Sequence, residues 1–329
     1  MTAAAATIQA FFTERLIGQR RASPHTIAAY RDTWRMLLSY AARQAGQQPC
    51  QLDLGDLDAP LVAAFLDHLE HDRGNSIRTR NARLAAIHSL FNYAALRHPE
   101  HAADIARVLA IPPKRGDQAI ITYLTDPEAE ALIAAPDQAT RTGRRDHALL
   151  ALAIQTGLRA SELLGLACGD VHLGAGAYVA CHGKGRKDRI TPLTPGTVTV
   201  LRNWLAERAG APHEPLFPSN RGETMSRDAL ERRLAAHTAR ATCTCPSLTG
   251  KTVTPHVLRH TAAMRLLHAG VDVTVIALWL GHESVNTTRI YLTADMEIKE
   301  KALNRTAPLA TTPGRYQPPD HLLAFLEAL

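Results

Sequence analysis

The sequence lacks the features that direct a chain into or across a membrane. No stretch of its 329 residues approaches the roughly 18 uninterrupted apolar residues that a transmembrane helix needs. The opening segment, MTAAAATIQAFFTERL, has no basic region ahead of its apolar residues, and polar residues interrupt the apolar run. It is therefore unlike a secretory signal. We expect a cytoplasmic protein with no membrane partner.

Cysteine and lysine are both scarce. The five cysteines are too few, and odd in number, for a disulfide framework in a chain of this length. Only six of the 37 basic residues are lysines. A chain with this bias is expected to keep lysine where the chemistry requires it, because arginine does not give up a proton near neutral pH. The net charge of +6 permits a nucleic-acid partner without requiring one.

The composition is that of a folded protein of about two domains. Hydrophobic residues make up 46% of the chain and charged residues 21%, as in globular proteins, and domains average roughly 150 residues. Residues 1–111 are expected to form a bundle of four or five helices. Helix starts are predicted at 23–24, at 59–60 and at Ser76, where a capping residue or a first-turn proline precedes apolar residues at helical spacing.

A second unit is expected after a linker at 112–118, where two prolines and a glycine stop any helix. Residues 119–306 are predicted to be mainly helical, with two short strands at 178–181 and 189–193 around a basic turn. The tail at 307–329 is rich in proline and threonine and is a candidate contact between protomers. The predicted helices include one near Asp126, one ending at Thr156, one opening near Arg159, and those at 226–241, 255–269, 273–280 and 284–303.

Two segments place an arginine three positions from a possible partner. In TGLRASEL, Arg159 opens a helix after a glycine turn, and Glu162 lies on the same helix face. In TPHVLRHT, His256 and Arg259 share a face at a helix start, which suits a phosphate. Taken alone, the first is most simply a solvent-exposed ion pair. The second lacks the further ligands that a zinc ion would need.

Two more segments hold a lysine, a histidine and a tyrosine. Lys184 lies in a turn between two glycines, where a DNA backbone can approach closely, and lysine can be tuned to donate a proton. His282 and Tyr291 lie in LGHESVNTTRIYL. Taken alone, a basic turn is usually solvated, and a lone tyrosine on an amphipathic helix is usually part of the core.

Together the four segments resemble the tyrosine recombinases, the family of phage integrases, Xer proteins and related transposon recombinases. The resemblance rests on TGLRASEL, GKGRKDR, TPHVLRHT and LGHESVNTTRIYL in this order. It implies a mainly α fold with a small β-sheet. An N-terminal helical-bundle (SAM-like) core-binding domain would occupy residues 1–111, and an α+β tyrosine recombinase catalytic domain residues 119–306.

The resemblance also implies a role for each residue. Arg159 and Arg259 would bind the non-bridging oxygens of the scissile phosphate, with Glu162 supporting Arg159. Tyr291 would be the nucleophile that forms a 3′-phosphotyrosine bond, and Lys184 would protonate the 5′ leaving oxygen. The two histidines, His256 and His282, would assist by proton transfer and hydrogen bonding. The covalent bond conserves the energy of the phosphodiester, so neither a cofactor nor a metal is expected.

The implied partners are double-stranded DNA with a specific recombination site and three further copies of the chain. Four protomers would act on two paired sites and pass through a Holliday junction, in some cases with companion recombinases or accessory proteins. Arg78, Arg80 and Arg83 are our candidates for DNA contacts in the first unit. A solvated helix face is an equally good interpretation of these three arginines.

The sequence departs from the Xer pattern in three places, and the departures after Tyr291 favour a recombinase of a mobile element, an integrase or a transposase. Segment 242–251 is longer than expected, and its Cys243 and Cys245 with His237 form a weak candidate for a metal site. The residues after Tyr291 differ from the usual Tyr-Thr-His-Val. The C-terminal tail is extended.

Three alternatives stay open. A Xer-type resolvase of chromosome or plasmid dimers would share the same residues. A type IB topoisomerase would share the chemistry without site preference, although the separate helical unit argues against it. A DNA-binding protein that has lost catalysis would be expected to lack some of the active-site residues, and all six positions are filled.

Overall fold

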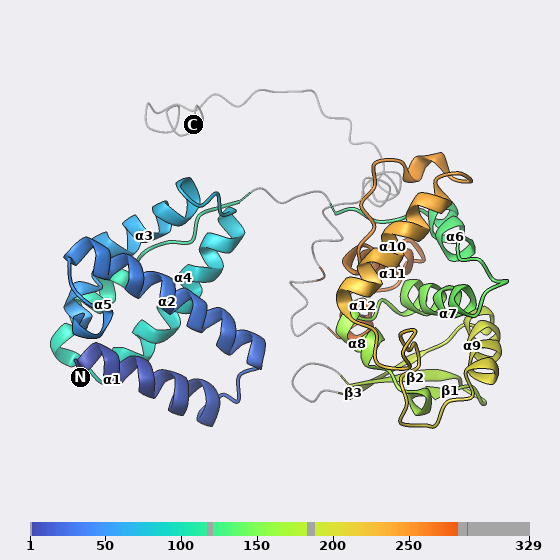
Figure 1. Ribbon diagram of the computed structural model, residues 1–329, viewed down its shortest axis with the longest axis horizontal. Coiled ribbons are helices and arrows are strands. Elements are labelled where there is room, and N and C mark those ends of the chain that lie inside the picture. The colour runs from blue at the N-terminus through green and yellow to red at the C-terminus, as the bar shows by residue number, and fades with distance from the viewer. Residues whose placement is uncertain (1, 117–120, 183–187, 282–287, 289–329) are drawn as a thin grey trace, which may run out of the picture. The chain divides into compact units, whose positions relative to one another are not determined.

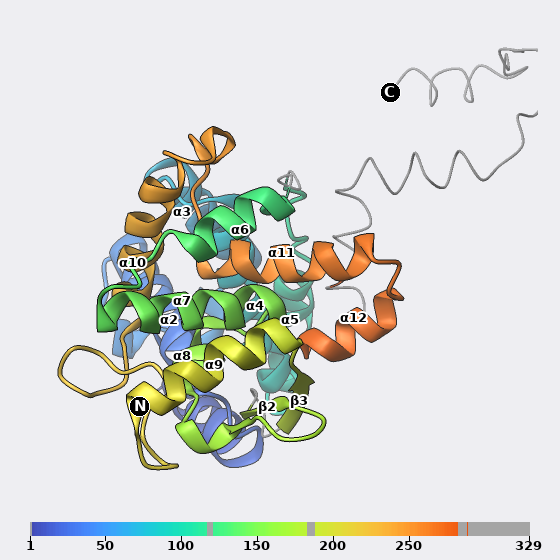
Figure 2. The same cartoon turned by 90° about the vertical axis from the view of Figure 1, so that its right-hand side faces the viewer.

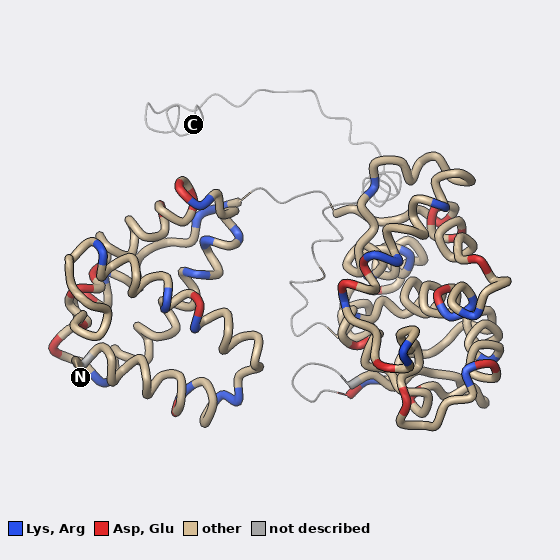
Figure 3. The backbone as a smooth tube through the Cα atoms, viewed as in Figure 1, with Lys and Arg blue, Asp and Glu red and all other residues tan. Residues whose placement is uncertain are grey.

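The computed structural model describes residues 2–116, 121–182, 188–281 and 288 (Figure 1). The chain divides into two compact units, Met1–Ala119 and Ile120–Leu329. No described helix combines the length and the apolar character that crossing a membrane demands. Acidic and basic positions are interspersed within each unit (Figure 3).

The first unit is a helical bundle. Its elements are α1 (Ala3–Ala10), the π-helical segment η1 (Phe11–Gln19), α2 (Pro24–Ala45), α3 (Ala59–His71), α4 (Ile77–Ala94) and α5 (Ala102–Leu109). The three predicted helix starts are confirmed. Ser23 Oγ accepts the N–H of Thr26, and Ser76 Oγ accepts the N–H of Thr79, each at 3.2 Å. Asp58 caps α3, which has a proline in its first turn.

Large apolar side chains fill the centre of this bundle because they recur at helical spacing on facing helices. The fully buried ones include Phe11, Trp34, Leu37, Phe65, Leu66, Leu69, Ile87, Leu90 and Phe91.

The second unit is mainly helical with one small antiparallel sheet. Its helices are α6 (Asp126–Ala134), α7 (Arg141–Thr156), α8 (Ala160–Gly165), α9 (Pro195–Arg208), α10 (Arg227–Ala241), α11 (Pro255–His268) and α12 (Val273–Leu280). The strands are β1 (Val171–His172), β2 (Tyr178–His182) and β3 (Asp188–Pro192), in the spatial order β1-β2-β3. The mainly α fold with a small sheet is thus confirmed.

Two of these elements were not predicted. β1 has only two residues, too few to show any alternation. α9 contains the run TVTV, whose β-branched residues favour strands over helices. Its cap at Thr194 and its first-turn proline are the local signals that identify it as a helix. Its inward-facing Leu201 and Trp204 are buried.

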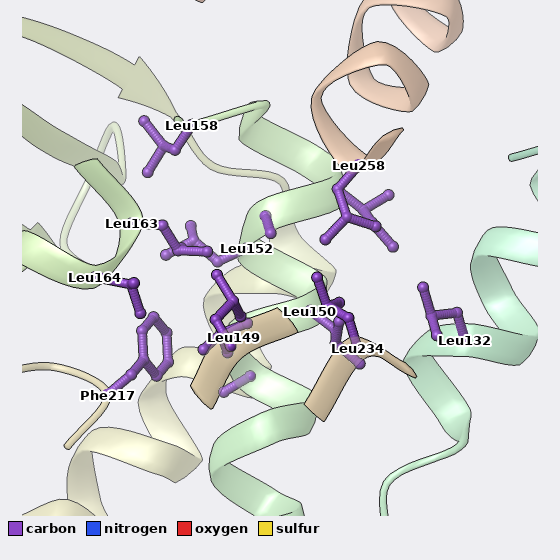
Figure 4. Close-up of a cluster of buried hydrophobic side chains, with 14 of the residues drawn as sticks. Leu132, Leu149, Leu150, Leu152, Leu158, Leu163, Leu164, Phe217, Leu234 and Leu258 are labelled. Carbon is purple, nitrogen blue, oxygen red and sulfur yellow. The ribbon is translucent and has the colours of Figure 1, made fainter. Parts of the chain in front are cut away.

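α7 is the central helix of the second unit. It lies between α11 and α9 (Figure 2) and is buried along most of its apolar length. Leucines of α7 meet side chains from α6, α8, α10 and α11 (Figure 4). The labelled members of this core are Leu132, Leu149, Leu150, Leu152, Leu158, Leu163, Leu164, Phe217, Leu234 and Leu258. Because α7 is packed on several sides, it is a rigid support for the residues at its C-terminal end.

Candidate active site

α7 ends at Gly157, where three helices come together. The residue has a positive φ of +65°, which glycine adopts at little cost. A Cβ added here would lie 2.7 Å from Leu280 Cδ2 and 2.9 Å from Ala262 Cβ. The absence of a side chain therefore lets the ends of α7 and α12 approach α11. The chain then turns into α8, whose N-cap is Arg159.

Arg159 is held at this meeting point by two neighbours. Its backbone N–H donates to Glu162 Oε2 at 2.8 Å, and its Nη1 donates to Glu162 Oε1 at 2.8 Å. Its Nη2 donates to the carbonyl of Gly281 at 2.8 Å. These side-chain bonds use two of the five donors of a guanidinium. The side chain is 35% exposed, so one side of the group is fixed and another faces solvent.

Arg259 reaches the same place from the second turn of α11. Thr254 caps this helix by accepting the N–H of Val257 at 3.3 Å. Nη1 of Arg259 donates to the carbonyl of Gly157 and Nη2 to that of Leu280, each at 2.7 Å. The residue is only 5% exposed.

Leu280 and Gly281 are consecutive, so the two guanidinium groups are bonded to adjacent carbonyls. These carbonyls close α12, where the helix dipole concentrates partial negative charge. That charge helps to hold two positive groups side by side. A pair of guanidinium groups in this arrangement is suited to binding a phosphate through charge-assisted hydrogen bonds.

Glu162 is a buried carboxylate rather than a surface partner, with its side chain 4% exposed. Burial alone would raise its pKa, but hydrogen bonds from Arg189 and from the backbone and side chain of Arg159 lower that pKa to about 2. The group is therefore ionised at any physiological pH. A charged carboxylate that accepts two hydrogen bonds from Arg159 keeps this residue in one orientation.

Two histidines flank Arg259 on α11. His256, one turn before Arg259, is exposed. His260 is half-buried. Burial and, to a smaller extent, the neighbouring His256 and Arg259 together lower the pKa of His260 to about 4. His260 is accordingly neutral near pH 7.

Lys184, His282 and Tyr291 lie outside the described residues, so their predicted roles stay predictions. The described residues that flank two of them can be located. β2 and β3 pair up to His182 and Asp188, on either side of 183–187. Gly281, whose carbonyl binds Arg159, directly precedes His282.

The three candidate DNA-binding arginines of α4 differ in their surroundings. Arg78 is exposed. Arg80 is buried, and its Nη1 donates to the carbonyl of Pro112 at 3.1 Å. Arg83 Nη1 donates at 3.0 Å to the Ala29 carbonyl and to a neighbouring threonine hydroxyl on α2. Arg80 and Arg83 therefore bond within the first unit. Arg83 is half-buried, and Arg78 is the exposed one of the three.

Two family models match this chain in the order of its two units. The N-terminal SAM-like domain of phage integrases matches residues 9–98, and the phage integrase family model matches residues 122–297. The chain belongs to the phage integrase family of tyrosine recombinases.

Curated relatives and solved structures agree with this assignment. The recombinase is 53% identical to integrase/recombinase y4rC of Sinorhizobium fredii, over 98% of this chain and 97% of that one. It is 32% identical to the tyrosine recombinase XerC of Pelobacter propionicus, over 92% and 95% of the two chains. The Tn1549 transposon integrase in complex with transposon right end DNA has a similar fold, with a TM-score of 0.67 at 17% identity over 90% and 98% of the chains.

One residue of this recombinase site was missed from the sequence. Arg189 on β3 donates to both oxygens of Glu162, at 3.0 and 2.7 Å. It stands in the basic run GRKDR, where charge alone does not single it out. Arg189 lies 27 residues after Glu162. Helical and strand periodicity predict contacts only between nearby residues, so neither could have predicted this pair.

The weak candidate for a metal site does not form. His237 Nε2 bonds instead to Asp146 Oδ2 at 2.9 Å, and Cys243 is exposed. Among the residues described, no three His, Cys, Asp or Glu side chains gather as a metal ion would need. Segment 242–251 is anchored differently: Ser247 Oγ and Lys251 Nζ each bond to the buried Glu128 at 2.7 Å.

Proposed function

We propose that this recombinase cuts and rejoins DNA at a specific site through a 3′-phosphotyrosine intermediate and a Holliday junction, in the service of a mobile element. The observation that carries the proposal is the pair Arg159 and Arg259, fixed on adjacent carbonyls. Two oriented guanidinium groups can neutralise the charge that builds up on a phosphate during displacement.

The reaction would proceed by in-line attack on the scissile phosphorus. Tyr291 Oη forms a bond to phosphorus while the bond to the 5′ oxygen breaks. A histidine, His256 or His282, takes the phenolic proton, and Lys184 gives a proton to the leaving 5′ oxygen. A free 5′ hydroxyl of another strand then reverses these steps. The phosphate ester is conserved throughout, so no cofactor enters.

The assembly would follow the family pattern. Residues 1–111 form the core-binding unit, 112–118 link it to the catalytic unit at 119–306, and 307–329 contact a neighbouring protomer. Four protomers would hold two double-stranded DNA sites. The similarity in fold to the Tn1549 integrase, solved with transposon right end DNA, supports the DNA partner.

A role in a mobile element is favoured over resolution of chromosome dimers. The chain is 53% identical to a protein named integrase/recombinase and 32% identical to one named XerC. A Xer-type resolvase is the second candidate because the similarity to the XerC relative also extends over nearly the whole chain. A topoisomerase of type IB is a weaker third candidate, because the separate N-terminal helical unit argues against it.

Covalent capture tests the proposal. The wild-type protein and Tyr291→Phe are mixed with sheared DNA of the host, the mixture is denatured, and DNA bonded to protein is recovered and sequenced. Wild-type protein should capture one short sequence, and Tyr291→Phe should bind the same sequence without capturing it, because only the nucleophilic oxygen is lost.

The other outcomes are equally informative. Capture by Tyr291→Phe would assign the nucleophile to another residue. Capture scattered over the whole genome would favour the topoisomerase. A captured sequence next to the flanking repeats of a mobile element would support that role, whereas a single chromosomal site shared by related strains would support the resolvase.

A further inference from the structure

Arg189 is the charged side chain that couples the β2–β3 hairpin to the arginine pair. On β3 it lies in register with Cys181 of β2. Its side chain is 14% exposed. Its Nη1 and Nη2 donate to the two carboxylate oxygens of Glu162 and form a bidentate pair. Bidentate pairs fix geometry as well as charge.

One carboxylate is thus shared by two guanidinium groups. Glu162 Oε1 accepts from Arg159 and Arg189, and Oε2 accepts from the backbone of Arg159 and from Arg189. The cluster of three side chains carries a net charge of +1. A carboxylate bonded to Arg159 alone would cancel the charge that Arg159 brings to a phosphate, whereas the shared one leaves a positive charge in place.

Arg189 also touches the second anchor of Arg159. A Cβ added at Gly281 would lie 2.8 Å from Nη1 of Arg189 and 3.1 Å from its Cζ. The guanidinium therefore lies directly against the residue whose carbonyl binds Arg159. Both groups that fix Arg159, the Glu162 carboxylate and the Gly281 carbonyl, are in contact with Arg189.

The ionisation of Glu162 depends on this contact as well. Burial disfavours the charged carboxylate, and the hydrogen bond from Arg189 is the largest of the effects that oppose burial and lower its pKa. Without Arg189 the carboxylate would remain buried and would lose this hydrogen bond, so its pKa would be higher than in wild type. Protonation of Glu162 would then deprive Arg159 of its ionised partner.

We propose that Arg189 is a positioning residue of strand cleavage, which orients Arg159 through Glu162 and Gly281. The inference rests on the proposed function, since it concerns the same phosphate-binding pair. It makes Arg189 necessary for the rate of the covalent step but not for the recognition of DNA.

The test compares Arg189→Gln with wild type on a duplex of the captured sequence. Formation of the covalent adduct at saturating DNA is expected to slow about 10- to 100-fold, because a misplacement of about 1 Å in a catalytic group can cost about 100-fold. Binding of the same duplex to both proteins should stay close to equal.

A control removes another bidentate pair of the second unit, one that is more exposed than Arg189 and Glu162. Arg144 is bidentate with Glu207, at 2.6 and 2.8 Å. It lies near the start of α7, at the opposite end of that helix from Gly157 and Arg159. Arg144→Gln should cleave at nearly the wild-type rate. Thermal unfolding of both variants shows how much of any loss is a loss of folded protein.

The pH profile distinguishes positioning from a general structural role. In Arg189→Gln the raised pKa of Glu162 should introduce an acid limb, so that cleavage falls as the pH is lowered through that pKa. Wild type and Arg144→Gln should lack this limb. Arg189→Lys should remove the limb, because it restores one charge, but should leave the rate at neutral pH below wild type, because lysine is not bidentate.

A double-mutant cycle identifies the route of the effect. If Arg189 acts through Glu162, the loss in Arg189→Gln/Glu162→Gln should be much smaller than the product of the two single losses. Wild-type rates and a wild-type pH profile in Arg189→Gln, or single losses that multiply, would overturn the inference. Absence of any adduct with the wild-type protein would instead refute the proposed function.

Discussion

At the scale of single residues, the site depends on backbone carbonyls as much as on charged side chains. Arg159 and Arg259 are oriented by three carbonyl groups, those of Gly157, Leu280 and Gly281. Buried carbonyls are costly to leave without donors. The same bonds that aim the arginines therefore also join α7 to α12, and a change to either arginine affects both cleavage and stability.

Gly157 gives a direct measure of this packing. Gly157→Ala should destabilise the second unit through two effects: the positive φ, which costs a side chain about 1–2 kcal/mol, and overlap with Leu280 and Ala262, which costs about 1–3 kcal/mol more. Chemical denaturation of the full chain measures the sum.

Gly270 supplies the control for Gly157. It also follows a helix of the second unit and has a φ of +81°, but an added Cβ would meet nothing within 4 Å. Gly270→Ala should therefore show only the cost of the positive φ. Equal losses in the two variants would mean that the close approach of α7, α11 and α12 contributes nothing.

At the scale of elements, the predicted linker at 112–118 begins as part of the first unit. Asn81 on α4 receives the N–H of Lys114 at 3.0 Å and donates to its carbonyl at 2.8 Å. Lys114 Nζ donates to Glu70 on α3 at 2.7 Å, and Arg80 Nη1 donates to the carbonyl of Pro112. The segment free to link the two units is accordingly shorter than its proline and glycine content suggests.

Asn81→Ala should release this segment without unfolding the bundle. The variant loses both backbone bonds to Lys114, so trypsin should cut after Lys114 and Arg115 several times faster than in wild type, as followed by mass spectrometry. Asn92→Ala is the control, because Asn92 is exposed on the same helix and bonds only within it, to His88. Equal cleavage of both variants would show that residues 112–114 are not held by Asn81.

At the scale of the whole molecule, the two units differ in how they hold their carboxylates. Among the described residues of the second unit, three buried carboxylates have lowered pKa values: Glu128, Asp146 and Glu162. Burial raises the pKa of each of these carboxylates, and hydrogen bonds from basic or polar groups lower it by more than burial raises it. In the first unit the carboxylates with lowered pKa, Glu70 and Glu100, are not buried.

This difference predicts that acid unfolds the second unit first. A carboxylate whose pKa is lower in the folded state stabilises the fold above its unfolded pKa and ceases to do so as the pH falls through the folded pKa. For Glu162 the window runs from 4.5 down to about 2, and its contribution is on the order of 3 kcal/mol.

Tryptophan fluorescence follows the two units separately. Trp34→Phe leaves Trp204 and Trp279, both in the second unit, and the variant with phenylalanine at those two positions leaves only Trp34 in the first. The second-unit signal should change at a higher pH than the first-unit signal. A single shared transition, or the reverse order, would contradict the assignment.

The sequence by itself determined the family, the two helical units and most of the helix starts. These features are local: a cap such as Ser23 or Ser76 acts within three residues, and apolar spacing of 3.6 residues is readable along one chain segment. The motif residues were likewise found by their order along the chain. Arg159 with Glu162 was the one contact of the site predicted correctly, because the two are three residues apart.

Only the tertiary structure decided how the arginines are held. Arg159 meets Gly281 across 122 residues, Arg259 meets Gly157 across 102, and Arg189 meets Glu162 across 27. It also decided that Arg80 and Arg83 bind backbone carbonyls of their own unit. The physical reason is that such bonds form where packed helices bring carbonyls and guanidinium groups within about 3 Å, and no sequence period records which distant segments will meet.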